Sequence, residues 1–171
     1  HIDYPEVVPH RLASLGVDPQ RVAPGVIWVK IDGKAAVDAC KTAVEKSPDV
    51  PRLRYQLGRA LDKFDDHAAA RAAFEIAAKR GYPRAQGAFG TSLLESGDEN
   101  RKAEGITWLR SAAEAGDTIA QYDLADHLHE GTLISRDLRE ARRLAMLAAA
   151  QGLPEAHQTI AEIAEEGDSS T

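Results

Sequence analysis

The chain lacks most of the residues and segments that enzymes and membrane proteins depend on. Its 171 residues include one cysteine, Cys40, so an intrachain disulfide and a multi-cysteine zinc site are both excluded. No apolar run approaches the roughly 20 residues that cross a bilayer, which argues against membrane insertion. There is no nucleophile elbow, no Walker phosphate loop and no G-x-G-x-x-G. We therefore expect no enzyme, no cofactor and no catalytic residue.

Long basic runs are also missing, and the net charge is −6, so nucleic acid is a poor partner. The charge is unevenly distributed, however. Residues 50–82 hold seven Lys and Arg against four Asp and Glu, whereas residues 118–171 hold four against ten. This pattern predicts a gradient from positive to negative along the molecule.

The sequence does contain a repeat of about 35 residues. Gly81, Gly116 and Gly152 are 35 and 36 positions apart, an alanine pair precedes each of them, and an alanine follows four residues later. Phe89, Leu124 and Ile160 repeat at the same intervals, and Leu57 fits the same place one shorter repeat earlier. The alternative is a closed seven- or eight-helix bundle with accidental spacing.

The segments between these marks have apolar residues at helical spacing. They predict helices at 34–46, 52–63, 67–80, 84–96, 101–115, 119–130, 137–151 and 155–166. Asp66, Asp117 and Asp137 are plausible N-caps, and the glycines lie where helices should end. Residues 1–33 are expected to form an irregular N-terminal cap with one short helix near 10–15 and a β-like run, Val26–Ile31. Residues 168–171 are expected to be a frayed tail.

Three stretches resemble Sel1-like repeats, which are related to tetratricopeptide repeats. The family pattern is approximately A-x-x-x-L-G-x-x-Y-x-x-G-x-G-V-x-x-D-x-x-K-A-x-x-W-Y-x-K-A-A-E-x-G. Residues 108–116, W-L-R-S-A-A-E-A-G, are similar to its end; residues 131–141, G-T-L-I-S-R-D-L-R-E-A, to its middle; and residues 85–90, A-Q-G-A-F-G, to its start. The usual tyrosine of the first helix is replaced by leucine, and the cysteine pair of some members is missing.

The resemblance implies an all-α fold, a right-handed α/α solenoid of Sel1/TPR-like helix pairs. Its domain plan is a half repeat at 34–49, repeats at 50–84, 85–119 and 120–155, and a terminal helix at 156–167. It also implies a non-catalytic adaptor, typical of bacteria, that binds a partner protein or peptide. The alternative is an accessory or regulatory domain of a larger enzyme, such as a hydrolase. Residues 35–59 are similar to a half repeat found in some extracytoplasmic bacterial proteins, which favours a periplasmic location, although a cytoplasmic one stays open.

In such solenoids the first helix of each pair lines the concave surface that binds partners. Helical spacing from the core positions then predicts a groove that starts basic and aromatic and ends acidic. The predicted partner-binding residues are Arg52, Tyr55, Arg59, Lys63, Arg84, Tyr122, Asp126 and His129. The cations would take an acidic segment and the two tyrosines would supply flat apolar contact. The alternative is a solvated, charged helix face.

Two other features favour structural interpretations. His127 and His129 lie about 200° apart around a helix, so a surface network of ion pairs is favoured over a metal site. Cys40 lies among alanines and a valine, which indicates a buried, inert thiol. The unpaired last helix exposes Ile160 and Ile163, so a weak homodimer is an alternative to a monomer.

Overall fold

The computed structural model describes residues 33–168, which contain eight α-helices and no strand. Of the cap expected at residues 1–33, residues 1–32 with the short helix and strand lie outside this described part, as do residues 169–171 of the tail expected at 168–171; Gly33 and Asp168 belong to the first and last helices instead. The chain divides into two compact units, residues 1–86 and 87–171, and each is described by itself.

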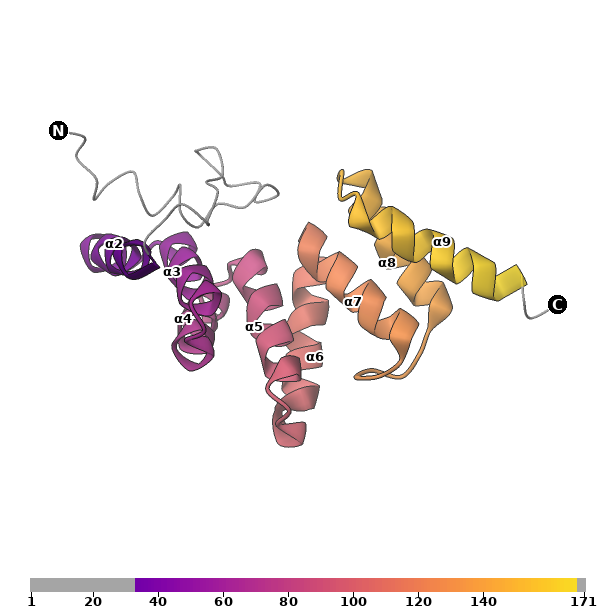
Figure 1. Ribbon diagram of the computed structural model, residues 1–171, viewed down its shortest axis with the longest axis horizontal. Coiled ribbons are helices and arrows are strands. Elements are labelled where there is room, and N and C mark those ends of the chain that lie inside the picture. The colour runs from indigo at the N-terminus through magenta and orange to yellow at the C-terminus, as the bar shows by residue number, and fades with distance from the viewer. Residues whose placement is uncertain (1–32, 169–171) are drawn as a thin grey trace. The chain divides into compact units, whose positions relative to one another are not determined.

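The described residues of unit 1, 33–86, form three helices and the start of a fourth (Figure 1). These are α2 (Gly33–Lys46), α3 (Pro51–Lys63), α4 (His67–Lys79) and the beginning of α5 (Pro83–Glu95). The helices α3 and α4 form a pair whose core holds Tyr55 and Phe74, with their ring centroids 5.8 Å apart. The thiol of Cys40 is fully buried, as expected, and burial raises its pKa to about 12.

In unit 2, residues 87–168 are described and form the rest of α5 and four further helices. They are α6 (Glu99–Glu114), α7 (Thr118–Glu130), α8 (Leu138–Ala150) and α9 (Glu155–Asp168). One apolar cluster built from alanine and leucine joins α6, α7 and α8, and it includes Leu109, Leu124 and Leu144. Stacked helix pairs thus bury a common core although aromatics are scarce.

The repeat is visible in the way the second helices end. At Gly81, Gly116 and Gly152 the backbone φ angles are 78°, 88° and 88°. At each of these sites the glycine N–H donates to the carbonyl three residues back, and the next N–H donates to the carbonyl five residues back. This closure needs a left-handed residue, which glycine adopts without strain. The repeated glycines are therefore helix stops of one geometry.

The starts of the helices follow the sequence equally closely. The carboxylates of Asp66, Asp117 and Asp137 accept hydrogen bonds from the N–H three residues ahead, so the expected N-caps are confirmed. Asp98, which was not predicted, caps α6 in a similar way. All eight predicted helices are present, with ends within two residues of those expected.

Candidate binding surfaces

In unit 1 the helix α3 presents a row of cations along one face. Arg52, Arg59 and Lys63 are separated by seven and four positions, which places them on the same side of the helix. Arg52 and Arg59 are half-buried, and Lys63 is exposed. The guanidinium carbon of Arg59 lies 5.9 Å from the centroid of the Tyr55 ring, a cation–π arrangement that holds the arginine in place. We call these three cations the basic row of α3.

Two of the predicted partner-binding residues in unit 1 are buried. Tyr55 is only 4% exposed, and its ring lies between Phe74 and Tyr82, whose centroid is 5.5 Å away in an edge-on contact. Arg84, at the start of α5, is 6% exposed. Neither side chain offers the open surface that the sequence predicted, because tertiary neighbours cover both. In unit 1 the exposed part of the predicted site is the basic row of α3.

In unit 2 the corresponding face of α7 carries Tyr122, Asp126 and His129, and all three are half-buried. Burial raises the pKa of Tyr122, and the charges of Asp126 and Asp123 raise it further. Burial also raises the pKa of Asp126, with Glu130 adding to the effect, whereas His127 and His129 oppose it. This face is therefore acidic, and nearby cations do not fully balance the negative charge of its carboxylates.

Asp123 belongs to the same acidic surface, although it was not among the predicted site residues. Burial raises its pKa to about 7, and the charges of Asp117 and Glu95 add to this, whereas the hydrogen bond from Thr91 lowers it. The Thr91 hydroxyl donates to the Asp123 carboxylate at 3.1 Å. A sequence signal did exist, because this repeat position is polar in three of the four first helices, as Gln56, Asp123 and Thr159, and is alanine, Ala88, in α5.

His129 ties the end of α7 to α9. Its Nε2 lies 3.1 Å from a carboxylate oxygen of Glu166, and its Nδ1 lies 4.0 Å from Glu162. Arg136 contacts the other oxygen of Glu166 and donates from Nε to the carbonyl oxygen of His129 at 2.9 Å. The ionic network expected around this histidine is confirmed. Because its ring and main chain are both engaged in unit 2, His129 is a weaker candidate for partner contact than Tyr122.

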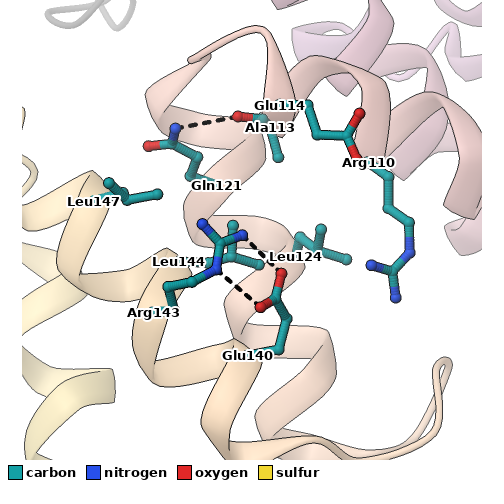
Figure 2. A pocket seen from close by; sticks show the side chains of 9 residues that line it. All are labelled: Arg110, Ala113, Glu114, Gln121, Leu124, Glu140, Arg143, Leu144 and Leu147. Atoms are coloured by element: carbon teal, nitrogen blue, oxygen red, sulfur yellow. Dashed lines mark hydrogen bonds and ion pairs between the residues drawn. The ribbon is translucent and has the colours of Figure 1, made fainter.

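A pocket of about 290 Å³ lies between α6, α7 and α8, and Figure 2 shows the side chains that line it. Its floor is apolar, with Leu124 and Leu144, and its rim is charged. Arg143 donates two hydrogen bonds to the carboxylate of Glu140, at 2.9 and 2.8 Å. These hydrogen bonds are the main reason why the pKa of Glu140 is lowered. These two side chains are therefore paired with one another at the rim.

A second pocket, of about 390 Å³, lies in unit 1 between the start of α2 and the end of α3. It is lined by Val37, Leu61 and the 39% exposed Phe64, with charged side chains around them. None of the eight predicted site residues lines either pocket. Within the described part of the chain, no group of three or more metal-ligating side chains is placed to hold an ion. The described helices include none that is long and apolar enough to cross a membrane.

Comparison with solved structures identifies the architecture. The chain superposes with a TM-score of 0.68 and 25% identity on c5321, a protective antigen of uropathogenic Escherichia coli strains that displays an SLR fold. The chain has the Sel1-like repeat fold. A Sel1 repeat protein from Oxalobacter formigenes matches with a TM-score of 0.55 and 24% identity, and the match covers 74% of this chain and 97% of that protein. The MamA RS-1 ArsTM double mutant matches with a TM-score of 0.56 and 20% identity, and the match covers 80% of this chain and 76% of that protein.

The Sel1-like match to c5321 covers 80% of this chain but only 30% of that protein. No protein-family model and no curated protein matches the chain by sequence. The expected all-helical repeat fold is therefore confirmed by structural likeness.

Proposed function

We propose that this chain is a non-catalytic adaptor that binds a partner protein or peptide on the surface formed by the first helices of its pairs. Support comes from the Sel1-like repeat fold, which is a protein-interaction scaffold in general terms.

The observation that carries the proposal is the basic row of α3. Lys63 makes no ion pair with any described residue, and Arg59 is held by the buried Tyr55 ring through its guanidinium face. A guanidinium fixed in this way keeps its N–H groups oriented, so it loses less conformational entropy when it binds a carboxylate. We assign an acidic segment of the partner to this row.

The acidic surface of unit 2 is assigned to a basic portion of a partner. It consists of Tyr122, Asp123 and Asp126, with Thr91 donating to Asp123. Burial is the main cause of the raised pKa of both carboxyl groups, and neighbouring carboxylates add to it; a cation placed here would offset the repulsion from those neighbours. The Tyr122 ring would add a face for an ammonium or guanidinium group.

The decisive experiment measures binding of a fluorescein-labelled acidic peptide, rich in glutamate with one aromatic residue, by fluorescence anisotropy. The test variant is Arg59→Glu with Lys63→Glu in the full chain. Reversal of two rim charges should weaken binding by about tenfold and reduce its dependence on salt. The matched control, Lys41→Glu with Lys46→Glu, changes two exposed cations on α2 of the same unit and should leave the affinity within about twofold.

Equal losses in the test and control variants would mean that only net charge matters, and the assignment to α3 would be wrong. Absence of saturable binding to the wild-type chain would also contradict it. Circular dichroism of both variants establishes that the helices are intact before the affinities are compared.

A further inference from the structure

The floor of the pocket between α6, α7 and α8 presents apolar surface in unit 2. Leu124 and Leu144 are 2% and 3% exposed, so the core cluster beneath the pocket holds them in place. Leu147 also lines the pocket, and it is 40% exposed. A side chain that entered the pocket would cover Leu147 and remove its apolar surface from water.

The rim of this pocket carries four charged side chains, and two of them are engaged with each other. Arg143 and Glu140 of α8 form the pair described above. On the other side of Leu124, Arg110 of α6 makes no hydrogen bond or ion pair with any described residue, and the same is true of Glu114 (Figure 2). The charge of Arg110 nevertheless contributes to the lowered pKa of Glu140, after the hydrogen bonds and the charge of Arg143, so its guanidinium acts on the same opening.

The repeat explains why Arg110 and Glu114 do not pair with each other. Their positions correspond to those of Glu75 and Lys79 in α4, where Lys79 Nζ donates to the Glu75 carboxylate at 2.7 Å. In α6 the order of the charges is reversed, with the cation nearer the start of the helix. This order is the less favourable one for a pair four residues apart. One cation and one carboxylate are therefore available at the rim.

We propose that this pocket is a second docking site, for a short partner segment in which an aliphatic side chain such as leucine stands between a cationic and an acidic residue. The aliphatic side chain covers the floor, the partner's carboxylate pairs with Arg110, and its cation pairs with Glu114. The rim holds two positive and two negative charges, so it complements a segment that is neutral overall. This segment differs from the acidic one assigned to the basic row of α3.

The size of the pocket and the spacing of the two charges limit what it accepts. A volume of about 290 Å³ is at the lower end for ligand pockets, which begin at about 300 Å³, so it suits one anchoring side chain and not a cofactor. Arg110 and Glu114 are four residues apart on one helix, which is about 6 Å along its axis. The two residues that flank an anchor are about 7 Å apart in an extended segment, which is a comparable spacing.

The site also lies apart from the surface of the proposed adaptor. Two of its three helices, α6 and α8, are second helices of their pairs, whereas the proposed adaptor surface is formed by first helices. Arg110 and Leu147 belong to no part of that surface. The inference therefore goes beyond the proposed function and adds an interaction site that can be tested separately.

The test titrates the ¹⁵N-labelled full chain with the acetylated and amidated peptide Gly-Lys-Leu-Glu-Gly and follows the amide resonances by NMR. Saturable shifts should fall on α6 around Arg110, on α7 around Leu124 and on α8 around Leu147. The same peptide with serine in place of leucine should bind at least about tenfold more weakly, because it leaves the apolar floor uncovered. This comparison changes only the peptide, so it does not depend on the folding of a variant.

Variants of the chain then test the rim and the wall. Arg110→Gln should weaken binding of the leucine peptide about threefold, and Leu147→Ser about fivefold. The matched control is Arg142→Gln, which removes an exposed arginine of α8 that does not line the pocket. The control should leave the affinity within about 1.5-fold.

Several results would overturn the proposal. They are the absence of saturable shifts, shifts centred on α7 around Tyr122 and Asp126, equal affinity for the leucine and serine peptides, and equal losses in Arg110→Gln and Arg142→Gln. The double variant Arg59→Glu with Lys63→Glu, which tests the adaptor proposal, should leave binding of the leucine peptide unchanged. A loss in that variant would place the peptide on α3 and contradict the pocket site, so the two proposals fail or succeed separately.

Discussion

The helix pairs α3/α4 and α5/α6 cross at the same repeat position but fill the crossing differently. A Cβ on Gly58 of α3 would lie 2.5 Å from a ring carbon of Phe74, which is a side-chain atom. A Cβ on Gly90 of α5 would lie 2.7 Å from the carbonyl oxygen of Gly105 and 2.8 Å from the main-chain nitrogen of Leu109. The first glycine makes room for an aromatic ring, and the second lets two backbones touch.

The third pair, α7/α8, shows a further solution at the same place. There Ala125 and Ala141 are both fully buried, and neither position holds glycine. The comparison teaches that different residue combinations can fill the same repeat position at a helix crossing. A ring can tilt to admit an extra methyl group, whereas a backbone cannot move without shifting the whole helix, so the two glycines should respond unequally to substitution.

The largest effect is expected for Gly90→Ala. The added methyl group collides with main-chain atoms of α6, and the gain in helix propensity of about 1 kcal/mol offsets only part of the strain. We expect a loss of about 3 kcal/mol in the free energy of unfolding, measured by urea denaturation. A loss below about 1 kcal/mol would contradict the close approach of the two backbones.

A smaller effect is expected for Asp123→Asn, and it depends on pH. The folded pKa of about 7 lies above the usual value for aspartate in an unfolded chain, so the folded state binds the proton more tightly. The contribution of Asp123 to stability is therefore fully present below about pH 4 and is lost as the pH rises through 7.

Asparagine keeps an acceptor for the Thr91 hydroxyl and removes this titration. The variant should therefore gain about 2 kcal/mol relative to the wild type between pH 5 and pH 8, as measured by urea denaturation at each pH. Parallel pH profiles of the two proteins would show that Asp123 is not the titrating group.

The glycine of the first pair should be less sensitive. Gly58→Ala forces the Phe74 ring to move, and we expect a loss of about 1.5 kcal/mol, half of that at Gly90. Phe74→Leu in the same chain removes the collision, so the double variant should be more stable than the sum of the two single losses by at least about 0.5 kcal/mol. Strict additivity in this double-mutant cycle would refute the ring contact as the cause.

The smallest effects are expected at the helix starts, where the two units can again be compared. Asp117 of unit 2 is 8% exposed and accepts from the N–H of Ala120 at 2.9 Å, whereas Asp66 of unit 1 is exposed and accepts at 3.2 Å. Replacement by alanine should cost about 1 kcal/mol at Asp117 and about 0.5 kcal/mol at Asp66. Thermal denaturation followed by circular dichroism can rank them, and the reverse order would contradict the role of burial.

Much of the fold was predictable because its signals are local. Gly81, Gly116 and Gly152 end helices through their own backbone conformation, and Asp117 caps α7 through a neighbour three residues away. Such features depend on a few adjacent residues, which the sequence displays directly. Because the pattern recurs about every 35 residues, a helix start or end assigned in one repeat could also be assigned in the next.

The exposure of the site residues was not predictable in the same way. Helical spacing placed Tyr55 with Arg59 on one surface, but the burial of Tyr55 depends on Phe74 and Tyr82, which come from other helices. The raised pKa of Asp123 likewise depends on burial and on α5. Contacts between elements decide which side chains remain open, and a single sequence does not specify them.

The most direct test of the adaptor proposal is an NMR titration of the ¹⁵N-labelled full chain with the acidic, glutamate-rich peptide. The account predicts that the largest shifts in amide resonances fall on α3 around Arg59 and Lys63, and that α7 around Tyr122 and Asp126 is unaffected. Shifts centred on α7, or no saturable shifts at all, would contradict it.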